Sequence, residues 1–122
     1  MMRALRAILA VIFLLSGVAK LMALPFEVAA FERWGYAIGF MYVVGLAECA
    51  GAIGVLLPLP SLRRVAAGGL ILLMLGALQT HLRHTEGGMA VLAALLLLAL
   101  ALVVWRPGGG DVNRMADSRR LR

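Results

Sequence analysis

Apolar residues gather along this chain in four long runs, and short segments between the runs hold most of the charged side chains. A bilayer core of roughly 30 Å is crossed by about 20 helical residues at about 1.5 Å of rise each. Each run has about that length, so the pattern predicts four membrane-spanning helices, over residues 4–24, 37–57, 65–84 and 88–105. We expect an all-α integral membrane protein that folds as a four-helix bundle.

The segments that follow the runs predict how the spans connect. Pro25 would end the first span, and helical spacing of apolar residues up to Trp34 predicts a short helix on the outer surface. Prolines and arginines in residues 58–64 predict a tight cytoplasmic turn. The four-helix domain would cover residues 1–106. A proline and three glycines come next, so we expect residues 107–122 to form a disordered, basic cytoplasmic tail.

Composition and charge agree with a lipid environment and indicate an orientation. Hydrophobic residues make up 63% of the chain, which is far above the range of water-soluble domains. Nine of the 12 Lys and Arg residues fall on the side of the two termini, and cytoplasmic segments keep the positive charge. We therefore expect a multi-pass protein of the cell membrane, the inner membrane where there are two, with both termini in the cytoplasm. The net charge of +6 then indicates topology and contact with the lipid bilayer, not nucleic-acid binding.

The first run also has features of a cleaved signal peptide. It has a basic start, an apolar middle and small residues at Gly17 and Ala19. However, its apolar stretch continues past Lys20 to Leu24, and its removal would leave an odd number of spans. We interpret it as a span.

Small residues spaced about one turn apart predict where two helices approach closely. The fourth run has no polar side chain between residues 89 and 104, so we expect it to pack or to face lipid. Cys49, the only cysteine, is expected to be a small core residue. The stripes that we expect at helix contacts are Ala47 with Gly51, Ala50 with Gly54, and Gly69 with Gly76.

Polar side chains inside the first two spans are candidates for function, because an ionisable group in the membrane costs roughly 2.5 to 3.5 kcal/mol on insertion scales. Glu48 lies about 16 Å below the outer end of its span, where it suits a proton-accepting role or, alternatively, a hydrogen bond that locks helices together. Lys20 lies about 6 Å below the same surface, with Ser16 one turn deeper on the same face. These two predict a polar ladder that opens outward, although Lys20 could instead extend its ammonium to the headgroups. About 10 Å of depth separates Lys20 from Glu48, so we do not expect an ion pair.

The third run ends with Gln79, Thr80, His81 and His84. Gln79 continues the stripe of Gly76, whereas His81 lies about 200° away on a helical projection, so we expect the two to face different directions. An interfacial histidine satisfied by water or headgroups is the alternative to a pocket role for His81. The two histidines lie three residues apart with no further histidine to complete a ligand set, so we expect no metal. The candidates for a polar, ligand-binding pocket are Ser16, Lys20, Glu48, Gln79 and His81.

A set of residues in a fixed order along the chain carries a resemblance to a known family. The set is Phe13, Ser16, Gly17, Lys20 and Leu21, then Gly35 and Tyr36, then Gly45, Glu48, Gly51, Ala52, Ile53, Leu57 and Pro58, then Ala77, Thr80, His81 and Leu82. In this order and spacing, the chain resembles the DoxX-like membrane proteins over all but its tail. The resemblance implies four transmembrane helices and places Lys20, Glu48 and His81 on the family's polar positions.

The resemblance also implies a functional hypothesis, because relatives of this family include a small subunit of a membrane thiosulfate:quinone oxidoreductase. By this hypothesis the chain is an accessory or anchoring subunit of a quinone-linked membrane redox system, with a polar pocket in the outer half of the bundle. Its cofactor would be a quinone, and its partners would be other redox subunits or a second copy of the chain. The alternative is a non-redox membrane module, such as a small transporter or an assembly factor. No complete catalytic set is visible in the sequence, so we do not expect a self-contained enzyme.

Overall fold

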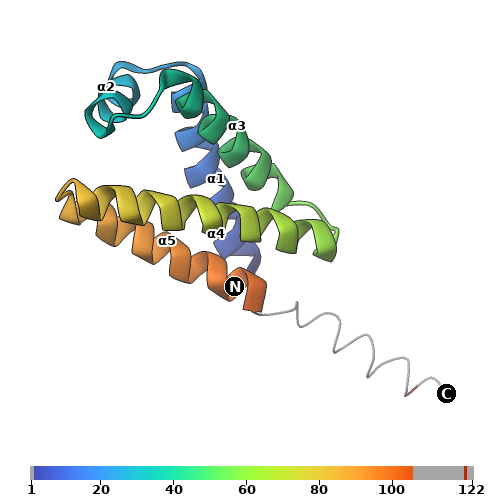
Figure 1. The fold of residues 1–122 in the computed structure, drawn as a ribbon. Helices are drawn as coiled ribbons and strands as arrows, with labels where there is room; N and C mark the ends of the chain where they lie inside the picture. The colour runs from blue at the N-terminus through green and yellow to red at the C-terminus, as the bar shows by residue number, and fades with distance from the viewer. Residues whose placement is uncertain (1, 106–119, 121–122) are drawn as a thin grey trace.

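The computed structural model describes residues 2–105 and Arg120, so the domain boundary at residue 106 and the predicted tail apart from Arg120 lie outside the described residues. The described part is all-α, as predicted, and contains five helices and no strand (Figure 1). The helices are α1 (Met2–Leu21), α2 (Pro25–Trp34), α3 (Ile38–Gly54), α4 (Pro60–Arg83) and α5 (Gly87–Trp105).

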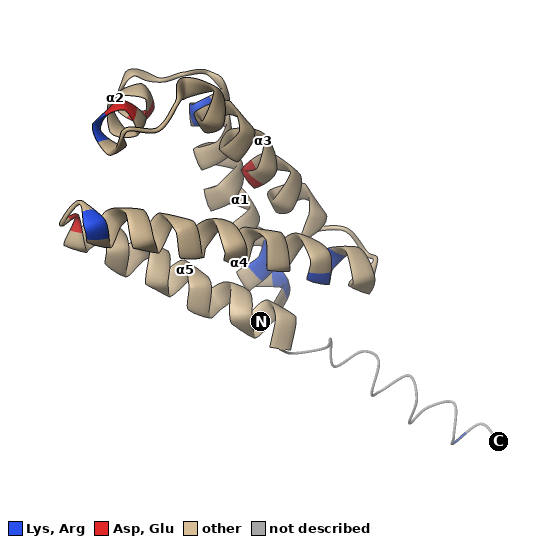
Figure 2. Cartoon of the chain, viewed as in Figure 1, with Lys and Arg blue, Asp and Glu red and all other residues tan. Residues whose placement is uncertain are grey.

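Three of these helices, α1, α4 and α5, are each long and apolar enough to cross a membrane. The consecutive helices α2 and α3 pass the same test only as a pair, and the chain bends by 119° between them. Charged positions lie mainly on α2, at the turn between α4 and α5, and near the starts of α1 and α4, and they leave long uncharged stretches between (Figure 2). The protein is therefore a small multi-pass membrane protein.

The helices form two antiparallel pairs that diverge toward α2 (Figure 1). One pair is α1 with α3, and the other is α4 with α5, and these two contacts are the most extensive in the fold. The pairs join through α3 against α4 and α1 against α5. The apolar core at this junction includes Leu9, Phe13, Val55, Leu70 and Leu100, all buried.

The short helix predicted after Pro25 is α2. Pro25 occupies its first turn, where a missing backbone N–H removes no helical hydrogen bond. Gly35 ends the helix with φ of 78°, a left-handed conformation that glycine adopts without steric cost. Its backbone N–H bonds the carbonyl oxygen of Glu32, and the chain then turns into α3.

The predicted turn over residues 58–64 is shorter in the structure. Helix α4 begins at Pro60, again with proline in the first turn, so Arg63 and Arg64 lie on the helix. The side chain of Arg63 donates a hydrogen bond back to the carbonyl oxygen of Leu57. That bond satisfies one of the carbonyls that α3 and its following turn leave free.

Two of the predicted small-residue contacts are confirmed, and others are wrong. A Cβ added to Gly51 would lie 2.5 Å from a methyl of Leu70, and one added to Gly54 would lie 2.5 Å from the Cβ of Ala66, so α3 and α4 do approach through glycine. A Cβ added to Gly69 or Gly76 would meet no atom of another element within 4 Å, and Ala47 and Ala50 are exposed. The face that α4 presents to the core is instead formed by Ala67, Leu70 and Met74.

Candidate functional site

A cavity of about 530 Å³ lies between the diverging helix pairs and α2. Most of its lining side chains are apolar or aromatic, and they come from all five helices and the segment before α3. The five residues predicted for a polar pocket all line this one cavity: Ser16, Lys20, Glu48, Gln79 and His81.

Lys20 forms the centre of the first polar cluster in this cavity. Its Nζ lies 2.9 Å from a carboxylate oxygen of Glu48, 3.4 Å from one of Glu27, and 2.8 Å from the hydroxyl of Ser16. The side chains of Lys20 and Glu48 are only 11% and 3% exposed. The ladder predicted for Ser16 and Lys20 is therefore present, and the Lys20 ammonium turns into the protein instead of outward.

The ion pair between Lys20 and Glu48 was not predicted, and the expectation of about 10 Å of separation in depth is wrong. That expectation assumed that the end of α1 and the start of α3 lie at the same depth in the membrane. In the structure a Cβ on Gly45 would lie 2.9 Å from the Cβ of Lys20, so Lys20 is level with Gly45, about 10 Å along α3 from its first residue. Side chains lean toward the N-terminus of their helix, which carries the ammonium of Lys20 back toward Ser16 and Glu48.

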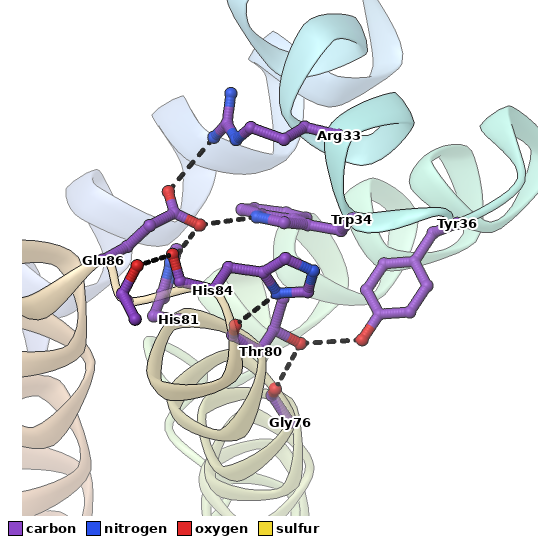
Figure 3. Close-up of polar contacts among 9 residues, drawn as sticks. Arg33, Trp34, Tyr36, Gly76, Thr80, His81, His84 and Glu86 are labelled. Atoms are coloured by element: carbon purple, nitrogen blue, oxygen red, sulfur yellow. Dashed lines mark hydrogen bonds and ion pairs between the residues drawn. The ribbon is translucent and has the colours of Figure 1, made fainter.

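A second polar cluster surrounds Glu86, in the turn between α4 and α5 (Figure 3). Trp34 donates its Nε1–H to one carboxylate oxygen of Glu86 at 2.6 Å, and Arg33 donates to the other at 3.1 Å. The hydrogen bond from Trp34 is the main cause that lowers the pKa of Glu86, with further contributions from Arg33 and His81 against an opposing desolvation. Glu86 therefore ties the end of α2 to the turn between α4 and α5.

His81 lies buried between this cluster and the cavity. Its ring packs edge-on against Trp34, with 5.3 Å between the ring centroids, and the residue is 7% exposed. Its Nδ1 is 3.7 Å from Glu86 and has no hydrogen-bond partner among the described residues. His81 is thus a residue of the protein interior, in contrast to the interfacial alternative. Gln79 also lines the cavity, but it is exposed.

Thr80 and Tyr36 form a third contact across the cavity (Figure 3). The Thr80 hydroxyl donates to the carbonyl oxygen of Gly76 at 2.8 Å, and the Tyr36 hydroxyl lies 2.8 Å from the same Thr80 oxygen. Because the Thr80 proton is used, Tyr36 is the donor in this second bond. His84 turns back on its own helix and bonds the carbonyl oxygen of Thr80 at 2.8 Å, so the two histidines do not converge.

Aromatic rings form one wall of the cavity. Phe31 lies with its ring centroid 5.2 Å from Trp34, 6.1 Å from Tyr36 and 6.3 Å from Phe40, all in tilted or edge-to-face arrangements. Such an array offers both ring faces and ring edges to a bound molecule. Together with the buried polar clusters, it suits an amphiphile that has an apolar or aromatic body and a small polar head.

The sequence did not single out Glu27, Trp34, Tyr36 or Glu86 as parts of the site. Glu27 and Trp34 reach the cavity because α2 folds back over it. Glu86, in the turn after α4, does not line the cavity but accepts a hydrogen bond from Trp34, which does. The only sequence signal is that Glu86 is a carboxylate at a predicted membrane surface, which is ordinary. Their role depends on the tertiary fold.

One of the comparisons with known proteins shows the family. A family model described as "DoxX-like family" matches residues 4–104, which include nearly all of the five helices. An uncharacterized protein of Bacillus subtilis (strain 168), YdgD, is 26% identical over 99 residues, which are 79% of this chain and 87% of that protein. No solved structure matches the chain at a significant level.

Proposed function

The chain belongs to the DoxX-like family, as its sequence predicts, and from this membership we propose that it is an accessory or anchoring subunit of a quinone-linked membrane redox system. In this role the cavity holds a small lipid-soluble ligand, for which a quinone is the candidate, and partner subunits carry out the chemistry. The bound quinone would supply electron transfer. The residues of this chain bind its head, shield it and fix its position.

In the proposed membrane arrangement α1, α3, α4 and α5 are the four spans, within a single domain over residues 1–106. The 17 residues of α3 extend about 25 Å, at the short end of the range for a transmembrane helix. The bend of 119° before α3 favours a surface position for α2. Nine of the 12 Lys and Arg residues lie on the side of the two termini, which supports a cytoplasmic position for both termini. Helix α2 and the cavity then lie in the outer half of the bundle.

The observation that carries the proposal is the buried ion pair of Lys20 and Glu48 in the wall of an otherwise apolar cavity. A buried ion pair is a weak source of stability, because the desolvation of both charges offsets most of their attraction. Ionisable groups inside membrane helices are in general associated with ligand or proton pathways. The cavity volume of about 530 Å³ is also in the range of small-molecule sites.

The two polar clusters provide separate positions for the head of a ligand. Lys20 and Glu48 lie on the α1–α3 side of the cavity, and His81 lies on the α4 side. The aromatic wall of Phe31, Trp34 and Tyr36 would pack against a flat ring. The apolar lining from α4 and α5 would contact an isoprenoid or alkyl tail.

Native mass spectrometry of the tagged protein, released from its own membranes in mild detergent, tests this proposal. We expect a quinone or a redox subunit to co-purify with the parent protein and to be lost from Glu48→Gln. Glu32→Gln is the matched control, because Glu32 is an exposed carboxylate of α2 outside the cavity. A bare monomer or homo-oligomer for both parent and variant would contradict the redox role and favour the non-redox membrane module.

A further inference from the structure

Most of the hydrogen-bond donors of the Lys20 cluster are used within the protein. An ammonium group has three N–H donors. Lys20 has three oxygen neighbours, on Ser16, Glu27 and Glu48, at 2.8, 3.4 and 2.9 Å. Two of its N–H groups donate hydrogen bonds, to Ser16 and Glu27, and the ammonium is ion-paired with Glu48, so a ligand in the cavity finds at most one N–H of Lys20 free.

The donors of the opposite wall are used in the same way. Trp34 gives its single N–H to Glu86. Thr80 gives its hydroxyl proton to Gly76, and Tyr36 gives its own to Thr80. The donors that remain are the hydroxyl of Ser16, one ring N–H of His81 and the amide of Gln79, and an amide or a neutral imidazole offers as many acceptor sites as donors.

Acceptor sites, in contrast, remain open on both walls. Glu48 and Glu27 each contact Lys20 through one carboxylate oxygen, and within the described part of the chain the second oxygen of each has no ion-pair or hydrogen-bond partner. The Tyr36 oxygen, which acts as a donor, keeps its lone pairs. The cavity also carries two carboxylates against one ammonium, so its local charge disfavours a head with exposed negative oxygen.

The ring of His81 has one donor and one acceptor nitrogen when it is neutral, and the carboxylate of Glu86 lies beside it. A proton on Nδ1 would face the carboxylate of Glu86 at 3.7 Å, which is longer than a hydrogen bond. The other ring nitrogen, Nε2, would then be the acceptor. Trp34 and Arg33 hold the Glu86 carboxylate, so they act as positioning residues for the imidazole of His81.

From this donor and acceptor inventory we infer that the cavity selects an amphiphile whose aromatic head donates hydrogen bonds, a phenol or the reduced, quinol form of a quinone, over a head that only accepts them. The inference rests on the proposed function in taking the cavity as a ligand site, and it names the class of that ligand. One hydroxyl of such a head would donate to the free oxygen of Glu48, and a second would reach His81. A site that binds an O–H group discriminates strongly against an analogue that lacks it, because buried acceptors are then left unpaired.

A pair of probes that differ only in the donor tests this inference: 4-nonylphenol and its methyl ether, 4-nonylanisole. Their binding to the purified protein in detergent would be measured by isothermal titration calorimetry. We expect the phenol to bind about tenfold more tightly or better, the effect of one hydrogen bond to a charged group. Equal affinities of the two probes for the parent protein would overturn the inference, and this comparison needs no variant.

Two further measurements locate the acceptor. Glu48→Gln places an amide donor where the carboxylate was, so we expect the preference for the phenol to shrink severalfold, while Glu32→Gln keeps it. An unchanged preference in Glu48→Gln that is folded by circular dichroism would overturn the assignment of Glu48. Decyltrimethylammonium is a cation without a donor, and if it binds as tightly as the phenol, charge and not hydrogen bonding governs the site, which also overturns the inference.

The outcomes separate this inference from the proposed function. A preference for the phenol in a protein that co-purifies with no quinone or redox subunit supports the ligand class and removes the redox role. A co-purifying quinone together with equal binding of phenol and ether supports the redox role and removes the ligand class.

Discussion

Gly17 of α1 and Gly45 of α3 face each other at the helix crossing, so closely that a Cβ on Gly17 would lie 2.7 Å from the carbonyl oxygen of Gly45. The same Cβ would lie 2.6 Å from the sulfur of Cys49, so the cysteine is part of this crossing and packs against the Gly17 backbone. The crossing fixes the level of α1 against α3. It therefore determines that Lys20 meets Glu48, three residues further along α3 from Gly45.

Gly17→Ala is predicted to separate the two helices, because the added methyl group has no space. Overpacking of this kind costs about 1–3 kcal/mol, and here it also pulls Lys20 away from Glu48. Thermal unfolding in detergent should show a lower midpoint than the parent protein. Gly39→Ala is the control, since a Cβ there meets no atom within 4 Å, and it should leave the midpoint unchanged or raise it. A midpoint for Gly17→Ala equal to that of Gly39→Ala would contradict the close crossing.

Removal of Lys20 alone is predicted to lower the free energy of unfolding more than removal of both Lys20 and Glu48. Lys20→Met leaves the carboxylates of Glu48 and Glu27 without their ammonium, and the loss of one partner of a buried pair typically costs about 3–5 kcal/mol. Glu48→Leu should cost less, because Lys20 keeps Glu27. The double variant should recover much of the loss in Lys20→Met, since it removes both desolvation costs.

Chemical denaturation of these three variants provides the measurement, with the double-mutant cycle giving the coupling between Lys20 and Glu48. Ligand binding is the second readout. The double variant should be more stable than Lys20→Met, although Glu27 still lacks its ammonium, and it should be deficient in binding the phenol probe. A double variant as unstable as Lys20→Met would show that the pair stabilises the fold and would argue against a binding role.

Three of the predicted spans correspond to helices that are long and apolar enough to cross a membrane, and the polar residues that line the cavity could be singled out from the sequence. Both follow because lipid forces apolar side chains outward and makes each interior charge conspicuous. The contact between Lys20 and Glu48 could not be predicted by counting along each helix from its end. It depends on the relative level of two helices, which the Gly17–Gly45 crossing sets.

The stripe of Gly69 and Gly76 failed as a packing signal for a related reason. Small residues permit close approach but do not require it, and α4 packs through Ala67 and Leu70 instead. Glu86 could not be assigned to the site at all, because a carboxylate in a surface turn has no distinctive pattern. Only the return of α2 brings Trp34 and Arg33 onto it.

The tie between Glu86 and α2 is predicted to weaken in acid. The pKa of Glu86 is lowered in the folded protein, chiefly by the hydrogen bond from Trp34, below the ordinary value of 4.5. A lowered carboxylate pKa stabilises the folded form above the ordinary value, and this contribution is lost as the pH falls through the folded pKa. The tie should therefore be intact at pH 7 and be lost at a pH below 4.5.

Trp34 fluorescence in a Trp105→Phe background measures this change, because the chain has two tryptophans. We expect the emission of Trp34 to shift as the pH falls below 4.5, and Glu86→Gln to abolish that shift. Glu32→Gln should keep the shift, as Glu32 is exposed on the same helix. The same acid shift in Glu86→Gln would mean that another group controls the position of α2.

Tyr36→Phe is predicted to loosen the wall of the cavity without a change in its shape. The substitution removes the hydroxyl that bonds Thr80 at 2.8 Å, and one such bond contributes about 1 kcal/mol. Thr80 keeps its bond to Gly76, so no buried donor is left unpaired. Tyr42→Phe is the matched control, since Tyr42 is an exposed tyrosine of the same helix as Phe40. Hydrogen exchange should show faster exchange at the start of α3 in Tyr36→Phe alone, and equal rates in the two variants would contradict a role of the Tyr36–Thr80 bond in holding α3 to α4.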